Sequence, residues 1–169
     1  LKPSESPLLG KVAALLSPKV VEYGVHLLGE FHPVQQLLDT VAVQLSDGRW
    51  LVADTSAAGS IHFRSRPPAL LDAFVRIRMN DDRFTLMATN CRSLCVDVTQ
   101  HERLAASAAH LGDLALFNYV SLDNGRSIWR AANGRYITLD AGGQHLAASV
   151  DSISDGQRFI LYPLHLPMR

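Results

Sequence analysis

The sequence predicts an all-β, barrel-like fold, and three observations lead to that prediction. A short pattern recurs with its turn residue at positions 48, 91 and 134, which are 43 residues apart in both steps. Within each copy, apolar residues alternate as they do in strands, and turn residues follow about every ten positions. A period of this length indicates a supersecondary unit that is too small to bury its own apolar face. The copies must therefore share one core.

Each copy of the pattern contains a turn between two strands. The copies span residues 46–54, 89–97 and 132–140. The turn dipeptides Asp47-Gly48 and Asn133-Gly134 tolerate the positive φ of a type I′ hairpin. Cys91 takes the place of glycine in the second copy, and a non-glycine residue is less comfortable at positive φ. We therefore expect a longer or bulged turn at Cys91.

Four short strands per unit are expected. The first two strands of each unit flank the turn described above. The expected third strands are 60–63, 104–107 and 146–149, and the expected closing strands are 74–77, 116–120 and 159–162. Three units of four short strands with regular turn signals are typical of an all-β barrel.

The third unit resembles a known family. It reads Trp-Arg-Ala-Ala-Asn-Gly-Arg-Tyr-Ile-Thr over residues 129–138, followed by Leu-Ala-Ala-Ser at 146–149 and Arg158-Phe159. This resembles a repeat of the fascin-like (actin-crosslinking-like) β-trefoils. The resemblance implies a β-trefoil of three units, near 41–79, 84–122 and 127–165, and actin binding as one activity. Because the matched positions build turns and core, it implies the fold more strongly than the activity.

The first 38 residues differ in kind from the rest. Leu8, Val12 and Leu15 fall on one face at helical spacing, and Ser17-Pro18 reads as the start of a second helix. We therefore divide the chain into a helical extension or interdomain segment, 1–38, and a β-trefoil domain, 39–169. The extension either packs on the barrel or docks an upstream domain or partner. Because the chain begins with Leu rather than Met, we expect it to be part of a larger polypeptide.

Six loop residues are candidates for ligand binding: Asp54, Arg64, Asp97, His101, Asp140 and His145. The three aspartates end the second strand of each unit, and the two histidines lie in equivalent loops. The alternative is structural, because aspartates at such positions often accept hydrogen bonds from the amides of the next loop. The arginines that follow the three turns either form a basic ring or cover the turns with their stems; they are Arg49, Arg92 and Arg135. The aromatic residues Trp50, Trp129 and Tyr136 are expected in the core rather than on sugar-stacking platforms.

Composition and motifs exclude several functions. Lys and Arg together number 16, as do Asp and Glu, so the chain lacks the basic charge of a nucleic-acid binder. The seven histidines show no zinc-site spacing, and neither a nucleophile elbow nor a phosphate-cradling glycine loop occurs. We therefore expect no metal, no cofactor and no catalytic residue. The Gln-x-Trp signature of ricin-type lectins is also missing.

Cys91 and Cys95 are expected to be free thiols, because the strand between them holds them beyond bridging distance. Free thiols are compatible with the cytoplasm, but they do not establish a compartment. We find no signal peptide and no apolar stretch long enough to span a bilayer.

Taken together, these features predict a non-catalytic recognition or targeting module that binds a glycan or a protein surface through its loops. Two alternatives remain open: an actin-binding fascin-like module, and an accessory domain of an enzyme whose catalytic part is absent from this chain.

Overall fold

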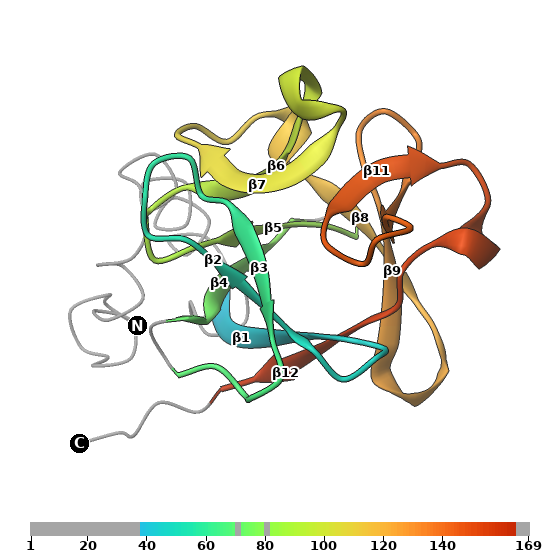
Figure 1. The fold of residues 1–169 in the computed structure, drawn as a ribbon, viewed down its shortest axis with the longest axis horizontal. Helices are drawn as coiled ribbons and strands as arrows, with labels where there is room; N and C mark the ends of the chain where they lie inside the picture. The colour runs from blue at the N-terminus through green and yellow to red at the C-terminus, as the bar shows by residue number, and fades with distance from the viewer. Residues whose placement is uncertain (1–37, 70–71, 80–81, 165–169) are drawn as a thin grey trace.

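The computed structural model describes residues 38–69, 72–79 and 82–164, which contain twelve β-strands in one continuous sheet (Figure 1). The strands fall into three consecutive units of four. The first unit holds β1 (Leu38–Leu45), β2 (Trp50–Ala53), β3 (Ile61–Arg64) and β4 (Phe74–Arg78). The second holds β5 (Arg83–Met87), β6 (Ser93–Asp97), β7 (Arg103–Ala108) and β8 (Phe117–Ser121). The third holds β9 (Arg126–Arg130), β10 (Tyr136–Leu139), β11 (Leu146–Val150) and β12 (Phe159–Pro163).

The first and fourth strands of the units close into a six-stranded barrel. The antiparallel pairs run from β1 to β4, β5, β8, β9 and β12, and then return to β1. The second and third strands of each unit pair as hairpins, and Figure 1 shows β2–β3, β6–β7 and the third hairpin with β11 grouped around the middle of the molecule. This arrangement is a β-trefoil, so the predicted all-β class and the three-unit architecture are confirmed.

Alternate residues of the barrel strands form the core. Trp129 is fully buried at its centre, stacked on Phe159 with ring centroids 3.9 Å apart and edge-on to Phe84 at 5.1 Å. The prediction that Trp129 is a core residue is therefore confirmed.

The same prediction is wrong for Trp50 and Tyr136, which are half-buried at the surface. Trp50 packs on Tyr162 with centroids 5.4 Å apart, and Tyr136 lies beneath the Arg130 guanidinium. The cause is strand alternation, because each of the two opens a strand whose next residue points into the core.

The turns between the first and second strands are alike in all three units. Gly48 donates its N–H to the Leu45 carbonyl at 3.0 Å, Leu45 donates back to the Arg49 carbonyl at 2.8 Å, and the positive φ falls on Gly48 at 93°. This is a type I turn followed by a left-handed residue rather than the predicted type I′ turn, which needs positive φ at two central residues.

The turn at Cys91 is bulged, as expected, but it is no longer than the other two turns and has the same geometry as they have. Cys91 adopts φ 62° and makes the same backbone bond as the glycines, to the Ala88 carbonyl. The Asn90 side chain stabilises the turn: its Oδ1 accepts from the Arg92 N–H at 2.9 Å, and its Nδ2 donates to the Ala106 carbonyl at 2.8 Å. These side-chain bonds offset the cost of a left-handed cysteine.

Cys91→Gly is expected to raise the free energy of unfolding by up to about 1 kcal/mol, because glycine adopts positive φ without strain. The greater conformational entropy of glycine in the unfolded state removes part of this gain. Urea denaturation measures the change. The matched control is Gly48→Cys, which places a side chain in open space at the equivalent left-handed position and should be destabilising. A loss above about 1 kcal/mol for Cys91→Gly would contradict this account of the turn.

Both cysteines are free, as predicted. Cys91 is exposed, and Cys95 is buried with its Sγ 3.3 Å from the Ser107 Oγ. The helices expected in residues 1–38 lie outside the described residues, apart from Leu38, which opens β1. Among the described residues, no helix is long and apolar enough to cross a membrane.

Candidate functional site

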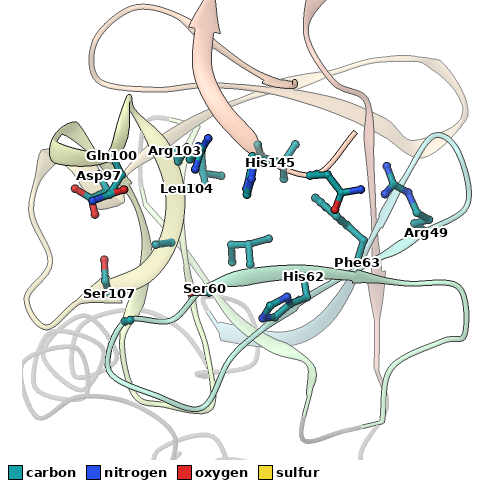
Figure 2. Close-up of a pocket in the computed structure, with 15 residues that line it drawn as sticks. Arg49, Ser60, His62, Phe63, Asp97, Gln100, Arg103, Leu104, Ser107 and His145 are labelled. Atoms are coloured by element: carbon teal, nitrogen blue, oxygen red, sulfur yellow. The ribbon is translucent and has the colours of Figure 1, made fainter. Parts of the chain in front are cut away.

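A depression of about 800 Å³ lies at the end of the molecule where the three hairpins meet. Strands β3, β7 and β11 contribute most of its walls, with further residues from the turn before β2 and from the loops before β7 and β11. Figure 2 shows Arg103 and His145 along one side and Ser60 and His62 along the other.

The hairpin of β7 meets each of the other two hairpins, and we call each meeting of two hairpins a junction. A backbone hydrogen bond closes both junctions of β7. Strand pairing places Phe63, Ala106 and Ala148 at equivalent positions in the three units. The Ala106 N–H donates to the Gly59 carbonyl at 2.8 Å, and the Ala148 N–H donates to the Glu102 carbonyl at 3.0 Å. Small alanine side chains permit these close approaches between neighbouring units.

The third junction, between β11 and β3, is bridged by a side chain. Here the equivalent residue is Phe63, and the Arg49 guanidinium lies over its ring, 4.7 Å from the centroid. Arg49 donates from Nη1 to the Gly143 carbonyl at 2.9 Å and is anchored from behind by Asp47. Strand β7 packs against both β3 and β11, whereas β3 and β11 pack less closely against each other. A large side chain at this junction therefore accounts for the opening in an otherwise closed hairpin end.

The depression has an apolar floor and a polar rim. Ile61, Leu104 and Leu146 occupy equivalent strand positions and form the floor. The preceding residues, Ser60, Arg103 and His145, stand at the rim (Figure 2). The threefold repeat therefore places three apolar and three polar side chains around one point.

Some of the lining groups already have partners. His62 Nε2 lies 3.0 Å from Asp54 Oδ1, and Asp97 Oδ1 accepts from the Thr99 N–H at 3.0 Å. By contrast, the four other long polar side chains of the lining form no hydrogen bond with any other described residue, and neither does the short hydroxyl of Ser60. The four are Gln100, Arg103, Gln144 and His145. These four can donate or accept hydrogen bonds to a ligand without breaking an internal bond.

Asp140 stabilises the loop that carries two of these side chains. Its Oδ1 accepts from the backbone N–H groups of Gln144 at 2.8 Å and His145 at 3.2 Å. The hydrogen bond from Gln144 is the main cause that lowers the pKa of Asp140 below its ordinary 3.8, with smaller contributions from His145 and Arg103. The stabilisation is therefore complete above the ordinary pKa and is lost as the pH falls through the lowered one.

The six candidate residues from the sequence lie in different places. Asp97 and His145 line the depression. Asp54 and Asp140 are not among the lining residues but contact some of them: Asp54 pairs with His62, and Asp140 accepts from the amides of Gln144 and His145. The other two, Arg64 and His101, are not among its lining residues: Arg64 pairs with Asp72 at 2.8 Å, and His101 ends the 3₁₀ turn Val98–Gln100. A binding role for any of the six stays a prediction.

Sequence reasoning missed Arg103, Gln100 and Gln144. It named Arg49 only as part of a basic ring or as a cover for its own turn, and not as a bridge between two hairpins. Strand pairing shows that Arg103 is equivalent to Ser60 and His145. Ser60 and Arg103 are 43 residues apart, like the turns of the repeat, whereas the third loop is one residue shorter and places His145 42 residues after Arg103. The three equivalent residues differ in type, so a search for recurring residues does not find this ring.

Comparisons with solved structures show the same fold. A designed threefold-symmetric protein, ThreeFoil, superposes with a TM-score of 0.64 and 15% identity over 74% of this chain and 99% of that one. SeviL, solved bound to the asialo-GM1 saccharide, superposes with a TM-score of 0.61 and 10% identity. The match covers 76% of this chain and 99% of SeviL. The BEL β-trefoil in an apo crystal form superposes with a TM-score of 0.61 and 12% identity. The match covers 75% of this chain and 93% of that one.

No protein-family description and no curated protein matches the sequence. The chain is thus a β-trefoil by fold, and at these identities the likeness extends to the fold alone. The fascin-like assignment and actin binding stay predictions.

Proposed function

We propose that this chain is a non-catalytic recognition module that binds a saccharide in the depression at the hairpin end. The observation that carries the proposal is the set of four hydrogen-bonding side chains without an internal hydrogen bond, placed above an apolar floor. A saccharide presents hydroxyl groups at its edge and C–H groups on its face. The polar rim can form hydrogen bonds with the hydroxyl groups, and the apolar floor can pack against the C–H groups.

The nature of the surface favours a small polar ligand over a protein. The depression, at about 800 Å³, falls in the range of small-molecule sites. The large apolar side chains that are most exposed among the described residues, Val98, Leu114, Ile153 and Tyr162, lie on four separate elements and form no apparent interface core. SeviL, which shares the fold at a TM-score of 0.61, was solved with a saccharide bound, and this supports the same ligand class here.

Arg103 is the residue whose removal tests the proposal best. It stands at the rim, is half-buried and forms no hydrogen bond with a described residue, so its guanidinium is available to a ligand. Hydrogen bonds to a charged group contribute about 1.5–3 kcal/mol. We therefore expect Arg103→Ala to weaken binding by about tenfold or more.

The chain is first screened on an array of neutral and acidic glycans, and the strongest hit is titrated against three proteins. These are the native chain, Arg103→Ala and the control Arg78→Ala, which removes an exposed arginine of β4 whose partner is Asp39. The expected result is a loss for Arg103→Ala alone. An array without hits, or equal affinities for the two variants, would contradict the proposal. Co-sedimentation with actin filaments would favour the fascin-like alternative instead.

A further inference from the structure

One part of the barrel's outer wall is buried although it points away from the core. In β4, Phe74 faces the core, so Val75 and Ile77 face outward. Yet Val75 is 1% exposed and Ile77 2%, and the outward-facing Met87 of β5 is 2% exposed. Strand pairing continues this surface onto β1, where Thr40 lies opposite Val75 and Leu38 lies opposite Ile77. We call Leu38, Thr40, Val75, Ile77 and Met87 the apolar wall.

The threefold repeat shows that the barrel does not bury this surface by itself. Val75 lies opposite Met87 between β4 and β5. The equivalent pair between β8 and β9 is Asn118 with Arg130, and both residues are exposed. The equivalent pair between β12 and β1 is Ile160 with Gln44, and both are half-buried. The apolar wall therefore has a cover that the other two positions lack.

The described strands do not provide that cover. The described elements that pack substantially on β4 are β1 and β5, which are its neighbours within the sheet. Neighbours in a sheet lie beside a strand and leave its outer face open. No described strand or 3₁₀ turn other than these two neighbours packs substantially on β4. We therefore look for the cover among the residues outside the described ranges, which are 1–37, 70–71, 80–81 and 165–169.

Length and composition single out the first of these ranges. Leu38 belongs to the apolar wall and is the first residue of β1, so the preceding chain enters the barrel at this surface. Residues 8–37 contain thirteen Leu, Val and Phe side chains: Leu8, Leu9, Val12, Leu15, Leu16, Val20, Val21, Val25, Leu27, Leu28, Phe31, Val34 and Leu37. The two internal gaps hold two residues each, and the C-terminal range holds five.

We propose that residues 8–37 pack on the apolar wall and cover β1, β4 and β5 of their own chain. The trefoil thereby carries a second apolar layer on one side. The layer lies on the barrel strands, whereas the proposed saccharide site is built by the hairpins, so the two can be tested separately. This assignment replaces docking to an outside partner as the use of the N-terminal segment.

The repeat itself supplies the test variant. Val75→Asn with Met87→Arg converts the wall pair into the exposed pair that the chain already has at Asn118 and Arg130. The matched control, Ile160→Asn with Gln44→Arg, makes the same conversion at the equivalent pair between β12 and β1. Only the first of these should release the N-terminal segment.

A lysine-specific protease reports on that segment alone, because the lysines of the chain are Lys2, Lys11 and Lys19. Cleavage after Lys11 and Lys19, followed by mass spectrometry on the full chain, should be at least about tenfold faster in the wall variant, since proteolysis follows the open population. The control should be cleaved at the native rate. If the double variant does not fold, Val75→Asn and Ile160→Asn form a milder matched pair.

Equal cleavage rates in the wall and control variants would overturn the proposal. So would a native chain that is already cleaved as fast as the wall variant. Sedimentation provides the remaining outcome: a native dimer that the wall variant converts to a monomer would show that a second copy covers the wall.

Discussion

Trp129→Ala is expected to lower the free energy of unfolding by about 3–5 kcal/mol. Trp129 is fully buried, stacks on Phe159 and contacts Phe84 and Phe117, so it touches aromatic side chains from three other barrel strands, β5, β8 and β12. Its removal leaves a large cavity that surrounding strands, closed into a barrel, cannot collapse to fill. The indole N–H also donates to Ser127 Oγ at 3.0 Å, so this buried hydroxyl, which itself donates to the Phe159 carbonyl, would lose the donor that it accepts from.

Chemical denaturation followed by circular dichroism measures the loss. The matched control is Trp50→Ala, which removes the same side chain from a half-buried surface position beside Tyr162. We expect its cost to be clearly smaller, because the cavity is open to water. Equal costs for the two substitutions would contradict a core built around Trp129.

The second large effect is expected at the junction between the first two units. Gly59→Ala should cost about 3 kcal/mol or more. An added Cβ would lie 2.0 Å from the Ala106 carbonyl oxygen and 2.4 Å from its carbon, and Gly59 has φ 59°. The clash is with backbone, so it also breaks the bond from the Ala106 N–H to the Gly59 carbonyl.

Gly48→Ala separates the clash from the backbone strain, because Gly48 has φ 93° and an added Cβ there meets nothing within 4 Å. Denaturation of both variants should show the larger loss for Gly59→Ala. If the two losses were equal, the close approach of β7 to the first hairpin would not contribute to stability. Gly59→Ala should also weaken saccharide binding, since that approach positions the wall of the depression.

The repeat made the fold predictable. Its spacing defined three units because turns and core strands recur in each copy, and both are local features of the sequence. The turn geometry was less predictable: Cys91 occupies a left-handed position in a turn that Asn90 holds by bonding to Ala106, sixteen residues away, as Asn133 does beside Gly134 by bonding to Ala148. Such a bond is a contact that no local pattern contains.

The site was predictable only in part. Recurrent aspartates were visible, and Asp97 lines the depression, but Asp140 is not a lining residue and instead binds loop amides. Arg103 was missed because its role arises from meeting Ser60 and His145, which belong to other units. The opening itself depends on Phe63 standing where the other units have alanine. The residues of this site occupy equivalent positions in the three units but differ in type from one unit to the next. A search for residues that recur in every unit therefore does not find them.

The most direct test of the central claim is to locate the ligand on the protein. The saccharide that scores highest on the array is titrated into ¹⁵N-labelled chain, and the amide shifts are mapped. The account predicts that the largest changes fall in residues 60–63, 103–105 and 144–146, which line the depression on all three hairpins. Changes centred on Trp50 and Tyr162, or on any other surface away from the hairpin end, would contradict it.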